Sequence, residues 1–190
     1  MRTHKHVFVL LLSTLIFASC SSNDDNPEII NEEELITTVR LTLTDPNGNT
    51  VVMDSQDLDG IGPDEPIVNV TGTIMASAQY AGSVQFLNET ETPADNITLE
   101  ILEEDEDHQV FYEIVGASGS TVSYTDLDSN GNPIGININF NSGVSGTDNV
   151  LTLTLVHLPN KEAQGVSDGS IANAGGETDA EVSFPYTVSN

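Results

Sequence analysis

Apolar and polar residues alternate along most of the chain after residue 35. The first clear example is Val39, Leu41 and Leu43, which are separated by polar residues. A period of two is typical of a strand with one buried face. The turn-forming stretch 45–49 follows, and the apolar pattern resumes at 51–53, so we expect a hairpin here. Similar patterns predict strands at 67–75, 83–87, 110–114, 121–124, 134–140, 151–155 and 182–188.

Two segments depart from this alternation. In the stretch 95–107, Ile97, Ile101 and Leu102 have helical spacing, which predicts one short inserted helix with Asp95 or Asn96 as its N-cap. The stretch 164–176 is rich in Gly, Ser, Ala and Asn and is expected to be a long loop.

The pattern as a whole predicts an all-β domain over residues 35–190. Many short strands separated by Gly, Pro and Asn turns favour an antiparallel immunoglobulin-like β-sandwich with one short inserted helix. Pro185 lacks a backbone N–H, so its strand is expected to lie at an edge.

The first residues carry the features of an export signal. Arg2 and Lys5 precede an apolar run, 7–18, that is too short to span a membrane. The run ends in the sequence Phe-Ala-Ser-Cys at 17–20, which resembles a bacterial lipobox. We therefore predict a lipoprotein signal peptide at 1–19 and lipidation of Cys20, which would anchor the chain to a membrane. The alternative is an ordinary signal peptide followed by an incidental cysteine.

Residues 20–34 are polar and acidic, which predicts a disordered tether after the lipidated cysteine. An acidic tract at this place resembles the signal that sends lipoproteins to the outer face of the outer membrane in one large group of Gram-negative bacteria. The resemblance favours a surface location, and a plain spacer that faces the periplasm is the alternative.

The net charge of the chain limits the classes of molecule that it can bind. The chain has 30 acidic residues against four Lys and Arg, for a formal net charge of −26, and only Arg40 and Lys161 of these bases follow the predicted signal peptide. Nucleic acid is excluded as a partner because phosphate contacts need clustered Lys and Arg. Divalent cations, basic protein surfaces and neutral ligands are possible partners. Alternatively, the charge serves only to keep the protein soluble.

Two acidic loops are candidate calcium sites. Asp126, Asp128 and Asn130, followed by a glycine, match the opening of an EF-hand-type loop, although its last position holds Asn137 and not glutamate. The same residues also form an ordinary hairpin turn. A second cluster brings four carboxylates into a glycine-containing loop, and like charges converge poorly there without a cation. Its members are Asp57, Asp59, Asp64 and Glu65.

Two histidines lie outside the predicted signal peptide. His108 and His157, with nearby carboxylates, are candidate ligands for zinc or copper. The alternative, which the sequence favours, is one surface histidine and one histidine at the rim of the core. Gly165 to Gly169 matches the G-x-S-x-G pattern of serine hydrolases around Ser167, but the match falls in a loop with no helix expected after it. We expect no catalytic residue.

Several short segments recur in a characteristic order along the chain, at 32–34, 57–60, 87–94, 107–109, 111–112, 128–133, 157–161 and 174–179. Their order resembles that in a group of small acidic bacterial outer-membrane lipoproteins associated with TonB-dependent receptors. Some of these relatives carry the label of a type 1 periplasmic binding fold. The resemblance implies a surface capture or uptake-accessory role. The chain is too short and strand-rich for the two-lobed architecture of that label.

Together these features predict a lipid-anchored, surface-exposed, non-catalytic binding module, accessory to TonB-dependent uptake of a metal or small nutrient. The alternative is a structural or adhesive surface lipoprotein that calcium stiffens.

Overall fold

The computed structural model describes residues 35–60 and 62–190. The predicted signal peptide, Cys20 and the tether therefore lie outside the described residues. The described residues belong to one compact unit, Glu33–Asn190. Within the described ranges, no helix has the length and apolar character needed to cross a membrane.

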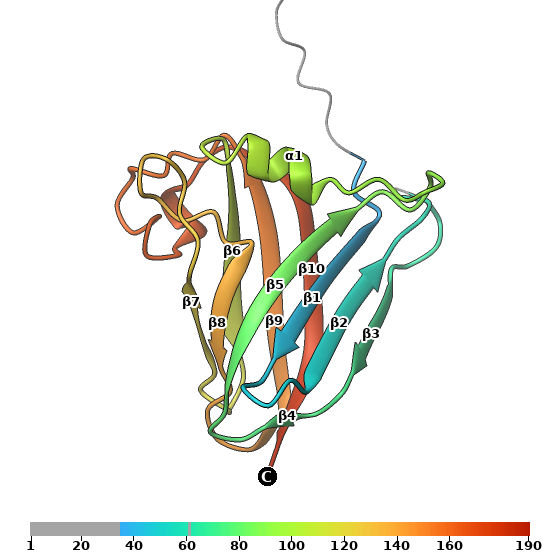
Figure 1. Ribbon diagram of the computed structural model, residues 1–190, viewed down its shortest axis with the longest axis vertical. Helices are drawn as coiled ribbons and strands as arrows, with labels where there is room; N and C mark the ends of the chain where they lie inside the picture. The colour runs from blue at the N-terminus through green and yellow to red at the C-terminus, as the bar shows by residue number, and fades with distance from the viewer. Residues whose placement is uncertain (1–34, 61) are drawn as a thin grey trace, which may run out of the picture. The chain divides into compact units, whose positions relative to one another are not determined.

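The protein is mostly β, with two sheets and one short helix (Figure 1). The strands of the six-stranded sheet are, in spatial order, β3 (Ile67–Thr71), β2 (Thr50–Gln56), β1 (Thr38–Thr44), β5 (Gln79–Leu87), β8 (Asn137–Asn141) and β7 (Thr121–Tyr124). Those of the four-stranded sheet are β4 (Ile74–Met75), β10 (Glu177–Ser189), β9 (Gly146–His157) and β6 (His108–Val115). All neighbouring strands are antiparallel except β4 and β10, which pair in parallel.

One hydrophobic core lies between the two sheets, and alternate residues of both sheets fill it. The predicted inward positions Leu41 and Leu43 of β1 are fully buried, as are Leu151, Leu153 and Leu155 of β9. Each fully buried leucine side chain stabilises the fold by about 1.5–3 kcal/mol. The period-two pattern therefore identified the buried faces of β1 and β9 correctly. The predicted strand 67–75 is instead divided into β3, whose residues are all exposed, and β4, which belongs to the other sheet.

The predicted helix is present as α1 (Thr98–Glu103), between β5 and β6. Its N-cap is Ile97, with no side-chain cap, so the prediction of an Asp95 or Asn96 cap is wrong. Asp95 is held instead by a β-bridge to Asn88. Leu102 is 39% exposed because this short helix turns only Ile97 and Ile101 into the core.

Pro185 lies in the part of β10 that has a neighbour on one side only. β4 pairs with Val188 and Ser189 alone, whereas β9 pairs with most of β10. The edge prediction for Pro185 is confirmed in this local sense. The missing N–H therefore leaves no gap between two paired strands.

Both basic side chains of the described ranges form ion pairs. Arg40 Nε donates to Asp54 Oδ1 at 2.7 Å across the β1–β2 pair, near the surface. Lys161 is buried, and its Nζ donates to Asp128 Oδ2 at 2.9 Å and to the Asp105 carbonyl oxygen at 2.5 Å. Lys161 thus ties the loop after β9 to the turn after α1 and to the turn at 128–132.

The two partners of this buried pair depend on each other. Burial raises the pKa of Asp128, but hydrogen bonds from Lys161 and from the amides of Asn132 and Asn130, with the Lys161 charge, outweigh burial and lower it overall. A lowered folded-state pKa stabilises the protein above the unfolded pKa of about 3.9, and this contribution is lost as pH falls through the folded-state pKa.

We predict that Lys161→Met lowers the free energy of unfolding by about 3 kcal/mol at pH 7, because it leaves a buried carboxylate without its cation. The loss should shrink as pH falls through the folded-state pKa of Asp128, because a protonated carboxyl group does not need the cation. Urea denaturation over a series of pH values measures the loss. The control Arg40→Met also removes one positive charge, and loss of its half-buried pair near the surface should cost less than about 1 kcal/mol. Equal losses in the two variants would contradict the role assigned to Lys161.

Candidate functional site

The candidate site is a cleft of about 320 Å³ on the outer face of the four-stranded sheet. Phe111 of β6 and Glu181 of β10 both pair with Thr154 of β9, so the three residues form one row across the sheet. Glu113 lies one row away on the same face, opposite Thr152. We call this the loop cleft, because residues 169–172 of the loop before β10 close its other side. Its lining residues are Phe111, Tyr112, Glu113, Thr152, Thr154, Gly169, Ser170, Ile171, Ala172 and Glu181.

The loop that closes this cleft is the predicted long loop, and it contains one 3-10 turn, Ile171–Asn173. A second, small hydrophobic cluster fixes it to the outer face of the sheet, where Val166 and Ala174 pack against Phe111 and Val156. Gln109 Nε2 also donates to the Val166 carbonyl oxygen at 3.0 Å. The loop therefore holds its position without a ligand, which lowers the entropic cost of binding.

A second cleft, of about 390 Å³, adjoins the loop cleft through Tyr112 and Gly169. Its walls include Tyr124, Leu127 and Asp168. The Tyr112 hydroxyl donates to the Gly135 carbonyl oxygen at 2.6 Å, and the Tyr124 hydroxyl donates to that of Val110 at 3.0 Å. Burial raises the pKa of Tyr124 to about 12 and that of Tyr112 well above its usual range, so both stay protonated at neutral pH.

The electrostatics of the loop cleft follow from the shortage of basic residues. Glu113 and Glu181 are exposed at its edges, whereas Arg40 and Lys161 are held in ion pairs elsewhere. Thr154 Oγ1 donates to Glu181 Oε2 at 3.4 Å, which leaves most of the acceptor capacity of that carboxylate for a ligand. The cleft can accept hydrogen bonds and positive charge, and it disfavours anions.

In the first predicted calcium loop, the carboxylates serve the turn. Asp126 accepts the amides of Gly135 and Asn137 at 2.9 and 2.7 Å, and Asp128 Oδ1 accepts those of Asn130 and Asn132 at 3.0 and 2.8 Å. The other oxygen of Asp128 binds the Lys161 ammonium group. These residues form a hairpin-type turn, in which the ammonium group of Lys161 supplies the positive charge next to Asp128.

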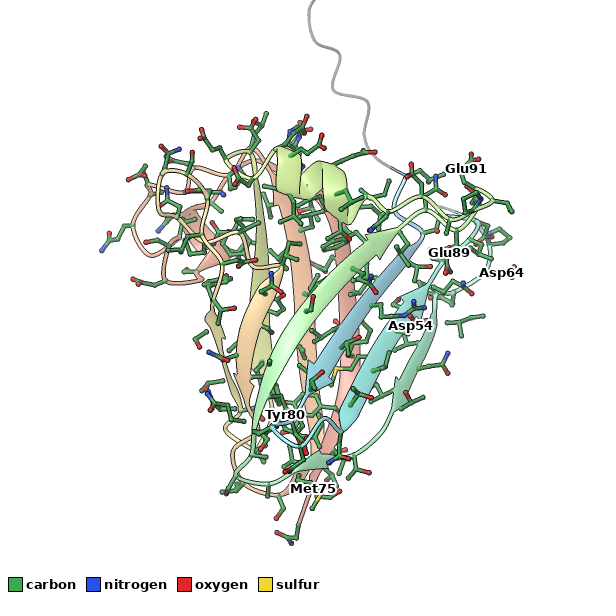
Figure 2. All side chains as sticks on the ribbon, viewed as in Figure 1. Asp54, Asp64, Met75, Tyr80, Glu89 and Glu91 are labelled. Atoms are coloured by element: carbon green, nitrogen blue, oxygen red, sulfur yellow. The ribbon has the colours of Figure 1, made fainter. Side chains whose placement is uncertain are left out.

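The second predicted calcium loop is more open. Asp57 Oδ1 accepts the Gly60 amide at 2.9 Å, and Asp59 Oδ2 accepts the Asp64 amide at 3.4 Å. Glu65 is exposed in the same loop, and Figure 2 shows Asp64 at the outer side of the molecule, beside the start of β3. Of the residues that the structure describes, Arg40 pairs with Asp54 and Lys161 with Asp128, so neither of these cations is paired with the four acids of this loop.

The structure brings the two histidines together. His108 and His157 face each other across β6 and β9, and their rings stack with centroids 4.8 Å apart. His108 is only 1% exposed, so the interpretation of it as a surface residue is wrong. The ring planes differ by 21°, so the in-plane lone pairs do not point at one site, and one ring would have to rotate to share a metal ion.

A carboxylate lies beside this pair because of a β-bulge. The register of β10 shifts between Thr178 and Ala180, and Asp179, the extra residue, has its Oδ2 atom 3.9 Å from His108 Nε2. His108 Nδ1 lies 3.1 Å from the Glu104 carbonyl oxygen, which can only accept, so Nδ1 donates. In a neutral ring of this tautomer Nε2 is an acceptor, and it faces the carboxylate of Asp179.

These placements leave the metal predictions open. Within residues 35–60 and 62–190, no three His, Cys, Asp or Glu side chains are arranged to hold a metal ion. Metal binding at both acidic loops and at the histidine pair stays a prediction. Ser167 lines the second cleft within a series of turns, and neither a strand before it nor an α-helix after it supplies the context of a nucleophile elbow.

Comparisons of the chain with protein-family models, with curated proteins and with solved structures give no match.

Sequence reasoning missed the acidic residues of the loop cleft. Glu113 and Glu181 are the polar members of two alternating strands, and alternation alone marks them as ordinary solvent-facing residues. Asp179 was missed because a bulge cannot be read from periodicity. The one available signal was Val166, an apolar residue in a Gly- and Ser-rich loop, which suggests that the loop packs on something.

We predict that Val166→Ala loosens the loop, because it removes two methyl groups from the small cluster. Amide hydrogen exchange over 163–175 should become faster, while the amides of β1 and β5 keep their protection. Val144→Ala makes the same chemical change at a residue that is 60% exposed and serves as the control. Uniformly faster exchange in Val166→Ala would show that the loop does not open independently.

Proposed function

We propose that this protein is a lipid-anchored, non-catalytic binding module whose ligand, a cationic or hydroxyl-rich neutral small molecule, occupies the loop cleft. The observation that carries the proposal is a preformed cleft edged by Glu113 and Glu181, in a domain whose basic side chains are both engaged elsewhere. Lipidation of Cys20 and display on the outer membrane surface belong to the proposal and derive from the sequence.

A role as an accessory to a TonB-dependent receptor rests on the family resemblance. It agrees with a rigid, acidic domain that would hold a nutrient or metal ion close to the membrane. The immunoglobulin-like class is also part of the proposal. Two mostly antiparallel sheets around one core support it, whereas the six-plus-four division and the parallel β4–β10 pair depart from the usual strand arrangement.

A melting experiment tests the loop cleft. The chain from residue 21 retains the whole compact unit and can be heated with a polyamine, choline, a neutral disaccharide or citrate as probes. We expect a cationic or neutral probe to raise Tm by several degrees, since a ligand at a hundred times its Kd adds about 2.7 kcal/mol to stability.

The shift should disappear in Glu113→Gln/Glu181→Gln. It should persist in Glu91→Gln/Glu103→Gln, which removes the same charge from exposed residues outside the cleft. Stabilisation by citrate, or the same response in both double variants, would contradict the assignment of the cleft.

A calcium-stiffened structural or adhesive lipoprotein is the second candidate. The acids of the 57–65 loop favour it, because four carboxylates lie in this loop while Arg40 and Lys161 are paired with Asp54 and Asp128. We predict that calcium raises Tm of the chelator-treated chain and that Asp57→Asn/Asp59→Asn abolishes the shift. The double variant Glu103→Gln/Glu177→Gln, which removes two exposed carboxylates outside this loop, should keep it. If zinc or copper raises Tm and His108→Gln removes this shift, the histidine pair is favoured as the metal site. If no ion changes the melting curve, metal binding is excluded at both the 57–65 loop and the histidine pair.

A further inference from the structure

The strand β3 is an edge strand whose residues are exposed on both faces. It is the last strand of the six-stranded sheet and pairs only with β2. All five residues are exposed, including Ile67 at 61%, Val68 at 38% and Val70 at 36%. The outer edge of such a strand presents a row of backbone N–H and C=O groups, together with apolar side chains, to an added strand.

The other sheet edges in the described part of the chain are protected. β10 carries Pro185, which has no backbone N–H to offer, and two register shifts interrupt its pairing with β9. The edge of β6 is covered, since the Val110 amide donates to the Ile134 carbonyl oxygen at 2.7 Å. β7 has four residues and is fastened to β6 by the Tyr124 hydroxyl. β3 has no proline, no charged residue and no bulge, so it lacks each of the usual defences against strand addition.

The residues around β3 indicate the charge of a strand that could be added at its open edge. Ile67 lies in register with Gln56, Gln56 with Thr38, and Thr38 with Leu87. The loop 57–65 and the segment after β5 therefore leave the sheet at the same end as the start of β3. Figure 2 shows Asp64, Glu89 and Glu91 gathered at this end.

A second copy of the chain is a poor occupant for this edge. Each copy has a formal net charge of −26, and close approach of two copies is opposed by that charge. The same charge attracts a basic segment. A strand that carries Lys or Arg at the end next to the 57–65 loop would gain main-chain hydrogen bonds from β3 and charge complementarity from the acids around it.

We propose that β3 is a docking edge for an extended, basic segment of a partner protein, which adds to the six-stranded sheet as a strand beside Ile67–Thr71. This surface is separate from the loop cleft and does not depend on the ligand proposed for it. The proposal adds a protein-recognition function, with a stated partner chemistry, to the small-molecule function proposed above.

Synthetic peptides test the inference on the chain from residue 21. One peptide, Val-Thr-Val-Thr-Val-Lys-Lys, has an alternating strand pattern and a basic C-terminal end, which lies beside the 57–65 loop when the peptide pairs antiparallel with β3 as the other strands of this sheet do. Its match has Glu in place of Lys. We expect the lysine peptide to bind, to protect the amides of 67–71 from hydrogen exchange, and to bind at least about tenfold more tightly than the glutamate peptide.

Matched variants locate the binding. Ile67→Lys/Asn69→Lys should weaken the lysine peptide by about tenfold or more, because edge lysines oppose strand addition and repel the basic end. Thr121→Lys/Ser123→Lys adds the same charge to exposed residues of β7 and should change affinity by less than about twofold. Melting curves establish that both variants are folded, and the two peptides compare charge on the unaltered chain.

Several results would overturn the proposal. They are the absence of binding at millimolar peptide, equal binding of the two peptides, and equal weakening in the two lysine variants. Loss of peptide binding in Glu113→Gln/Glu181→Gln would place the peptide in the loop cleft. A dimer in sedimentation experiments that Ile67→Lys/Asn69→Lys converts to a monomer would assign the edge to a second copy.

Discussion

The shortage of positive charge is the constraint on which the rest of the structure depends. With 30 acidic residues and four basic ones, the fold must accommodate carboxylates that have no counter-charge of their own. In the fold, carboxylates with a structural role accept hydrogen bonds from backbone amides and from hydroxyl or amide side chains. Asp126 accepts two amides, and Glu89 accepts the Thr38 hydroxyl and the Gln56 side-chain amide, which lower the pKa of Glu89. Ionised acids are thereby stabilised without ion pairs.

Against this background, the use of a lysine in the interior is informative. Lys161 lies where the turn after α1, the turn at 128–132 and the loop after β9 meet, and it is 5% exposed. A buried cation that is bonded to a carboxylate and a carbonyl group fixes the mutual positions of these segments, because any displacement leaves a charge unpaired in a medium of low dielectric constant. The loop that closes the cleft continues directly from this anchor. Arg40, on the surface, has no comparable role.

The β-rich character, the short helix and several buried faces could be predicted from the sequence, and the candidate site could not. Alternation at Val39, Leu41 and Leu43 identified β1 together with its buried face, because one buried face per strand imposes a period of two. Glu113 and Glu181 are far apart in sequence, and only the pairing of β6, β9 and β10 brings them to one cleft. His108 and His157 meet for the same reason. Asp179 joins them through a bulge, which has no signature in the alternation of residues.

The sequence by itself determined the class of secondary structure, the buried faces, the excess of negative charge and, as predictions, the export signal and the lipid anchor. These are properties of local pattern and composition, and they do not depend on which strands are neighbours. The tertiary structure alone decided which edges are covered, which carboxylates lie together and where the two ion pairs form. These features depend on contacts between segments that are distant in the chain, and the free energies of such contacts are set by packing and burial, which no local pattern specifies.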